Sequence, residues 1–147
     1  NKLFPGTRTV IHEKEVAQAR NHEPFEFFGY SDKSWDFEGL ELETVSGDLK
    51  LAKGVFLYET PGHTVGHYSL LLKPGGSTPM LFAVDVAYTA AALEKGIQPG
   101  FHNNPSAGVR SIRRVKELAA EHGAEIFYSR DMDVWHSYRH APDAYEI

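Results

Sequence analysis

The chain has 147 residues, a length typical of one domain, with 41% hydrophobic and 24% charged residues, which is an ordinary balance for a globular protein. Its net charge of −5 argues against nucleic acid or an anionic membrane surface as the main partner. Because cysteine is absent, disulfides and thiolate metal sites are excluded, and any metal site must use the 8 histidines and 20 acidic residues.

The ends and the hydropathy of the chain give expectations about its context. No apolar run approaches the roughly 20 residues that a membrane helix needs. The opening NKLFPGTRTV lacks the charged-then-apolar pattern of a secretory signal, so we expect a cytoplasmic protein. The chain opens on Asn1 in a loop-like segment, and we expect a piece of a longer chain that forms a single domain over residues 1–147.

The first third of the chain predicts a strand, a helix and an aromatic segment. A strand is predicted over residues 7–12 and a short helix over 14–20, with Val16 and Ala19 on one face. Residues 25–37 are rich in Phe, Tyr and Trp without a clear period. Such a segment either contributes to a functional site, as long loops often do, or packs against the sheet.

The middle of the chain predicts strands. Residues 40–60 alternate apolar and polar positions around a Ser-Gly-Asp sequence, as two short strands joined by a turn would, and a third strand is predicted over residues 54–60. Two further strands are predicted over 68–73 and 80–84, on either side of a Pro-Gly-Gly turn. The second of these is apolar on both faces, which is typical of a buried central strand.

The clearest helix of the sequence spans residues 105–122. Asn104 can cap it, Pro105 fits its first position and Gly123 ends it. A final strand is predicted over 125–129. The predicted buried stripe of the helix is Val109, Ile112, Val115, Leu118 and Ala119. Strands followed by a helix and a strand predict an α/β fold with helices on one face of a sheet.

Polar residues follow three of the predicted strands. His63 lies in the turn after the strand over 54–60, Asp85 follows the strand over 80–84, and Arg130 and Asp131 follow the last strand. Ligands of layered α/β folds gather where such strand ends converge. Each residue alone would be a surface group or would stabilise a turn, but together they favour a site. A carboxylate after a buried strand needs a partner charge or a metal, and an imidazole is a common zinc ligand.

A second histidine, His67, lies four residues after His63 in the sequence TPGHTVGHYSL, residues 60–70. Histidines that bind metals need hydrogen-bonding neighbours that fix their orientation. We interpret His67 as such a supporting residue rather than as a ligand.

The motif TPGHTVGHYSL, followed 22 residues after His63 by Asp85 in FAVDVAYT, resembles the C-terminal half of a metallo-β-lactamase-fold hydrolase. The later run PGFHNNPSAGVRSIRRVKELAAEHGAEIFYSRD is similar to that of the N-acyl homoserine lactonases. The resemblance covers nearly the whole chain and implies part of an αββα sandwich, its second half and part of its first. The HxHxDH motif of the family does not occur in the chain, which resembles the sequence directly downstream of that motif.

The resemblance implies roles for individual residues. His63 matches a metal-binding histidine, Asp85 matches an aspartate that bridges two metal ions, and Tyr88 matches a tyrosine that assists at the substrate carbonyl or at the leaving oxygen. The implied cofactor is zinc, as two divalent ions that share a hydroxide able to attack a lactone carbonyl.

One position departs from the family. Arg130 stands where relatives have their last metal-binding histidine, and a guanidinium has five donors and no acceptor, so it cannot bind a cation. One of the two metal positions would then be weakened or lost, unless His102, His136 or His140 substitutes.

The leading hypothesis is a metal-dependent hydrolase that opens a lactone, namely an N-acyl homoserine lactone, and so acts in quorum quenching. Its partner would be a small-molecule lactone, with neither nucleic acid nor a membrane. Two alternatives stay open: another hydrolase of the superfamily, acting on a thioester or a different lactone, and a catalytically silent scaffold or interaction protein. Half of a sandwich would expose an apolar sheet face, which leaves a homodimer open as well.

Overall fold

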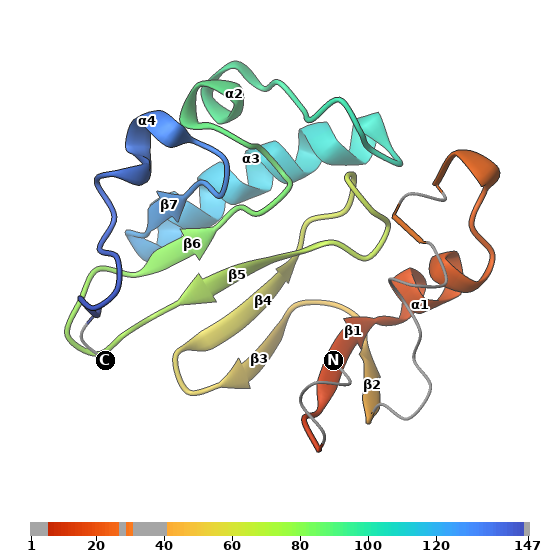
Figure 1. Cartoon of the computed structure of the whole chain (residues 1–147), viewed down its shortest axis with the longest axis horizontal. Helices are drawn as coiled ribbons and strands as arrows, with labels where there is room; N and C mark the ends of the chain where they lie inside the picture. Colours follow the sequence, from red (N-terminus) through yellow and green to blue (C-terminus); the bar gives the residue numbers. More distant parts are fainter. Residues whose placement is uncertain (1–5, 27–28, 31–40, 146–147) are drawn as a thin grey trace. The chain divides into compact units, whose positions relative to one another are not determined.

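The computed structural model describes residues 6–26, 29–30 and 41–145 (Figure 1). Contacts divide the chain into two compact units, Asn1–Ser46 and Gly47–Ile147. The single domain expected over 1–147 stays a prediction. Most of the aromatic segment 25–37 lies outside the described residues.

The first unit contains a parallel pair of strands and one helix. Strand β1 (Thr9–His12) pairs with β2 (Leu42–Val45), and α1 (Glu13–Arg20) follows β1 directly. His12 caps the helix, because its Nδ1 accepts a hydrogen bond of 3.0 Å from the backbone N–H of Lys14. The helix buries Val16 and Ala19, as the sequence predicts, and a single 3-10 turn, η1 (Pro24–Glu26), comes after it.

The second unit is built on a five-stranded sheet in the order β3-β4-β5-β6-β7. Neighbouring strands are antiparallel from β3 to β6, and β7 is parallel to β6. The strands are β3 (Leu49–Ala52), β4 (Val55–Glu59), β5 (Tyr68–Leu72), β6 (Met80–Phe82) and β7 (Glu125–Phe127). The strands predicted on either side of Gly47 exist, but β2 pairs with β1 and β3 pairs with β4.

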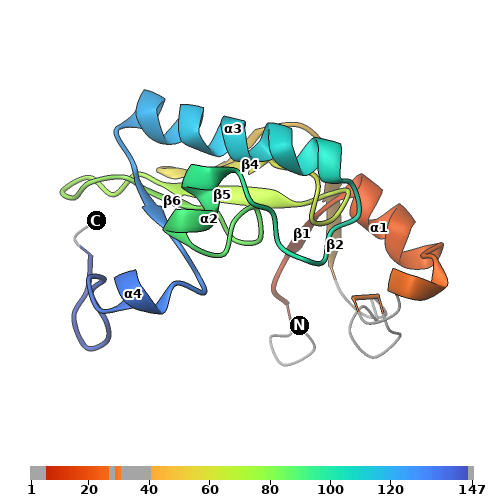
Figure 2. The same cartoon turned by 90° about the horizontal axis from the view of Figure 1, so that it is seen from above.

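Helix α3 (Pro105–His122) lies along one face of this sheet (Figures 1 and 2). Its predicted ends are confirmed: the side chain of Asn104 accepts a 2.9 Å hydrogen bond from Ala107 N, and Gly123 takes the left-handed φ of 58° that ends many helices. The structure has two short helices that the sequence did not predict. Helix α2 (Ala90–Lys95) precedes α3, and α4 (Met132–Trp135) follows β7.

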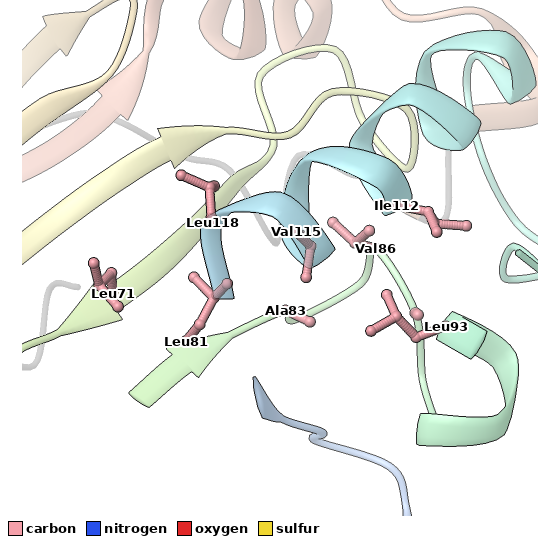
Figure 3. Packing of buried hydrophobic residues seen from close by; sticks show 9 residues of the cluster. Leu71, Leu81, Ala83, Val86, Leu93, Ile112, Val115 and Leu118 are labelled. Atoms are coloured by element: carbon pink, nitrogen blue, oxygen red, sulfur yellow. The ribbon is translucent and has the colours of Figure 1, made fainter. Parts of the chain in front are cut away.

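The hydrophobic core lies between the sheet and helices α2 and α3 (Figure 3). Leu71 and Leu81 of the central strands are fully buried there. The cluster consists of Leu71, Leu81, Ala83, Val86, Ala87, Leu93, Ile112, Val115 and Leu118. The predicted helix stripe is wrong at one position, since Val109 is 36% exposed. Gly108 and Ser111 face inward instead, because that part of the helix packs closely against a turn.

The turn in question carries the PGH sequence, and backbone hydrogen bonds attach it to the start of α3. The N–H groups of Asn103 and Asn104 both donate to Gly62 O at 2.9 Å, and Asn103 N also donates to His63 O at 3.0 Å. The hydroxyl of Ser111 donates to Pro61 O at 2.6 Å. Three successive carbonyls of the turn are therefore bound by one segment.

Gly62 is the residue that permits this close approach. Its φ is 144°, a value that L side chains rarely adopt, and a Cβ atom on it would collide with the backbone of Gly108. The glycine of the PGH sequence is thus required by packing, and it fixes the place of the next residue, His63.

Among the described residues, the C-terminal segment covers the other face of the sheet near β6 and β7. The ring of Phe127 contacts Phe82 and Tyr138, with centroids 4.7 and 4.3 Å apart, so aromatic side chains pack on this part of the second face. Apolar side chains of this face from β4 and β5, among them Val55, Leu57, Leu70 and Leu72, are partly exposed. No helix within the described ranges is long and apolar enough to cross a membrane.

We predict that Gly62→Ala lowers the free energy of unfolding by more than about 1 kcal/mol, because alanine disfavours this φ and its Cβ meets the backbone of α3. Gly108→Ala is the matched control. Its Cβ meets only the end of the flexible Gln98 side chain, and alanine favours a helix, so its stability should change little. Chemical denaturation of both variants checks this, and a Gly62→Ala variant as stable as the parent would contradict the close approach.

Candidate functional site

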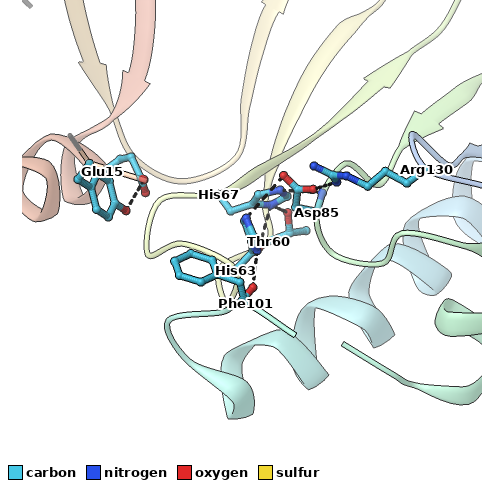
Figure 4. Close-up of polar contacts among 8 residues, drawn as sticks. Glu15, Thr60, His63, His67, Asp85, Phe101 and Arg130 are labelled. Carbon is cyan, nitrogen blue, oxygen red and sulfur yellow. Dashed lines mark hydrogen bonds and ion pairs between the residues drawn. The ribbon is translucent and has the colours of Figure 1, made fainter. Parts of the chain in front are cut away.

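The three polar strand ends predicted to converge do so in the structure (Figure 4). His63 from the turn after β4, Asp85 from the turn after β6 and Arg130 from the loop after β7 lie at one end of the sheet. The side chains of His63 and Asp85 are 17% and 20% exposed, and that of Arg130 is 52% exposed. The site is therefore partly shielded but reachable from solvent.

The orientation of His63 is fixed by a backbone carbonyl. Its Nδ1–H donates to Phe101 O at 2.8 Å, since a carbonyl can only accept. A neutral ring with its proton on Nδ1 has an unprotonated Nε2, and this atom lies 3.6 Å from Asp85 Oδ2. Metal-binding histidines commonly have this arrangement, with one nitrogen on a carbonyl and the other left for the ion.

The two carboxylate oxygens of Asp85 have different neighbours. Oδ2 is the oxygen nearest to His63, whereas Oδ1 accepts a hydrogen bond from Arg130 Nη1 in an ion pair. The guanidinium of Arg130 also stacks over the ring of Tyr88, 4.1 Å from its centroid. The hydrogen bond to Asp85 raises the pKa of Arg130, so this cation stays charged at every working pH.

Both ring nitrogens of His67 take part in hydrogen bonds within the protein. Nε2 accepts from the backbone N–H of Asp85 at 3.3 Å, so the neutral ring has its proton on Nδ1. Nδ1 lies 3.1 Å from the carbonyl and 2.9 Å from the hydroxyl of Thr60. His67 thus links the end of β4 to the turn that carries Asp85. This geometry agrees with the supporting role predicted for it, which stays a prediction.

A strained turn before Asp85 determines where its side chain points. The N–H of Val86 donates to Ala83 O at 3.1 Å and closes the turn, and Val84 within it has a positive φ of 53°. A β-branched residue with positive φ is rare and costs about 1–2 kcal/mol. The predicted strand over 80–84 ends at Phe82 for this reason, and the chain bends so that Asp85 faces His63.

The donor set fits part of a metal site. The 3.6 Å between His63 Nε2 and Asp85 Oδ2 is too long for a hydrogen bond and is close to the separation of about 3.4 Å between two ligands of one tetrahedral zinc ion. In the described ranges, no group of three or more His, Asp and Glu residues lies close enough together to hold an ion. These residues therefore supply two ligands and not a complete site.

The three histidines considered as substitutes do not complete it. His102 Nδ1 bonds to Pro99 O at 2.9 Å, and His140 Nε2 bonds to Trp135 O at 2.9 Å. His136 ends helix α4 and is exposed. In the part of the chain that the structure describes, none joins His63 and Asp85, so the substitution considered from the sequence is not seen.

Some contributors to the site left no clear signal in the sequence. The carbonyl of Phe101 orients His63, but a backbone oxygen has no residue signature. Asp131 is buried, 6% exposed, and accepts hydrogen bonds from Ala90 N at 2.8 Å and Asp133 N at 3.2 Å. It anchors the loop of Arg130 to the start of α2, and its place after a strand was the one available clue.

Two cavities formed by described residues lie away from the His63–Asp85 pair. One cavity has a volume of about 890 Å³ and is lined by the β5–β6 turn and the C-terminal segment. An apolar hollow of about 450 Å³ adjoins it on the second sheet face. Both are at the opposite end of the strands from Asp85, and neither is lined by His63 or Asp85.

Comparisons with known proteins agree with the resemblance found in the sequence. The N-acyl homoserine lactonase AttM of Rhizobium radiobacter is 30% identical over 148 residues, which cover 97% of this chain and 56% of that protein. A solved structure of an N-acyl homoserine lactone hydrolase, with the product N-hexanoyl-L-homoserine bound at its catalytic metal centre, has a TM-score of 0.85 and 28% identity over 97% of this chain and 54% of its own.

A more distant structure, the dizinc quorum-quenching lactonase AidC, has a TM-score of 0.66 at 14% identity, over 90% of this chain and 51% of its own, and supports the fold alone. No protein-family profile matches the chain. The similarity to N-acyl homoserine lactonases and the α/β fold, as part of a metallo-β-lactamase sandwich, are confirmed. The chain spans about half the length of the relatives that it matches.

We predict that Val84→Gly leaves the free energy of unfolding unchanged or raises it, because the relief of strain at φ 53° offsets the entropy cost of glycine, about 0.5–1 kcal/mol. Val109→Gly is the control, since Val109 has the same 36% exposure within a helix and should lose stability. Urea denaturation compares the two. Equal losses in both variants would contradict the strain.

Proposed function

We propose that this protein is a metal-dependent hydrolase that opens the ring of an N-acyl homoserine lactone. The observation that carries the proposal is the pair of His63 Nε2 and Asp85 Oδ2, 3.6 Å apart at the ends of β4 and β6. It occurs in a chain that is similar over 97% of its length to N-acyl homoserine lactonases. Activity, substrate and partners of the whole protein are part of this proposal, because the chain spans about half of those relatives.

Different residues of the chain would bind the metal and stabilise the charge that develops on the substrate. His63 and Asp85 would hold a divalent metal, zinc by preference, because zinc takes imidazole nitrogen and carboxylate oxygen readily. Such an ion, when bound, polarises a carbonyl and lowers the pKa of water to roughly 7. Phe101 O keeps the proton of His63 on Nδ1, so that Nε2 stays available to the ion. A phenol donor such as Tyr88 can stabilise the developing oxyanion or the leaving ring oxygen.

The proposed partner is a small-molecule lactone, and the function would be quorum quenching. The solved relative that holds N-hexanoyl-L-homoserine supports this class of ligand. The net charge of −5 gives no attraction to nucleic acid or to an anionic membrane surface. We further propose a cytoplasmic location.

A second candidate function is a catalytically silent scaffold. The ion pair between Arg130 and Asp85 favours it, because a guanidinium bound to a carboxylate competes with a metal for the same oxygen. Loading the protein with metal and testing for hydrolysis separates the two candidates.

We expect the metal-loaded protein to open N-hexanoyl homoserine lactone faster than the corresponding thiolactone or a thioester, as followed by proton release. His63→Ala and Asp85→Asn should each lower kcat/KM more than about 100-fold, since even residues that only orient metal ligands cost 10–100-fold. His136→Ala and Asp143→Asn replace exposed residues of the same types and should keep the activity. No lactone opening by the metal-loaded protein would refute the proposal.

We also propose self-association through the second sheet face, where Leu57 and Leu70 are cross-strand partners and partly exposed. Residues 1–147 alone should form dimers or larger species when their mass is measured by light scattering over a concentration series. Leu57→Lys should lower the mass, whereas Val109→Lys, on the exposed side of α3, should not. A monodisperse and cooperatively melting monomer would contradict this proposal.

A further inference from the structure

The two carboxylate oxygens of Asp85 have different kinds of neighbour. Oδ1 is bound by the guanidinium of Arg130, and Oδ2 lies 3.6 Å from Nε2 of His63. One oxygen thus already has a permanent cation, whereas the other faces an imidazole nitrogen. The two sides of this carboxylate are therefore not equivalent as metal ligands.

Two contacts between residues 88–90 and residues 130–131 hold the guanidinium of Arg130 in its place. Arg130 stacks on the ring of Tyr88 at 4.1 Å. The next residue, Asp131, is buried and accepts a 2.8 Å hydrogen bond from the N–H of Ala90, two residues after Tyr88. The side-chain contact and the backbone contact thus join the same two stretches of chain, 88–90 and 130–131, and position the cation beside Asp85.

A second metal ion could not share Oδ1 under these conditions. A guanidinium offers donors only and stays protonated, so it can neither ligate an ion nor give up its charge. A divalent ion at Oδ1 would then lie in contact with a fixed positive charge, and the two cations would repel each other.

We propose that this centre takes a single divalent ion, on the side of His63 Nε2 and Asp85 Oδ2, and that Arg130 replaces a second ion as a fixed cation. The inference rests on the proposed function and specifies its cofactor. It distinguishes this chain from the dizinc lactonase whose fold it shares. Asp85 then acts as a ligand through one oxygen and not as a bridge, and Arg130 is the residue that positions it.

The test is a metal count on the full-length protein, stripped with a chelator, reloaded with excess zinc, dialysed and measured by mass spectrometry of the elements. We expect one ion per chain for the parent and for Arg130→Lys, which keeps the positive charge. Arg130→His removes the charge and adds a donor, so its count should rise to two. Arg110→His, an exposed arginine of α3, is the control and should stay at one.

The outcomes separate this inference from the proposed function. Two ions in the parent protein, or one ion in Arg130→His, would overturn the inference and leave a metal hydrolase standing. No ion in the parent protein would contradict the proposed function and the inference together. Thermal melts with and without zinc verify that each variant is folded, and the partial exposure of Arg130, 52%, makes its replacement safe for folding. Titration with cobalt gives an independent count, with visible absorption that should reach its plateau at one equivalent in the parent.

Discussion

The contact on which the site depends is the backbone approach of the PGH turn to the first turns of helix α3. Because Gly62 has no side chain, its carbonyl reaches two N–H groups of the residues before the helix, and the helix packs against the turn at Gly108. The segment before α3 also provides the Phe101 carbonyl that selects the tautomer of His63. One close approach therefore sets both the position and the protonation pattern of the imidazole, and the rest of the site is arranged around it.

Asp85 reaches the same place by a different physical route. Strand β6 lies between two neighbours in the sheet, and its Leu81 is fully buried in the core, so its end is rigid. The strained turn at Val84 then redirects the chain within two residues, and His67 accepts the N–H of Asp85. Stability of the core is thus used to hold an unfavourable backbone conformation, as is common at functional sites. The result is a carboxylate whose two oxygens face different groups.

How much the sequence could predict depends on how local each signal is. The ends of α3 are set by Asn104 and Gly123 alone, so they were predictable, whereas the exposure of Val109 depends on how the helix meets a turn that lies far away in the sequence. The polar strand ends were predictable as a group, because parallel and antiparallel neighbours bring such ends together. The pairing of β2 with β1, the Phe101 carbonyl and the φ of Val84 left no trace in residue identity.

The order around Arg130 argues for a role of this residue in the site. A half-exposed arginine without a role would gain side-chain entropy by moving into solvent, and a surface ion pair alone stabilises a protein by at most about 1 kcal/mol. Here the guanidinium has an aromatic ring beneath it and a carboxylate in front of it, and a buried aspartate fixes the adjacent backbone. Two contacts thus converge on the cation, and a third fixes the backbone next to it. Because they converge at the carboxylate that faces His63, the positive charge is an organised part of the centre and governs what else can bind there.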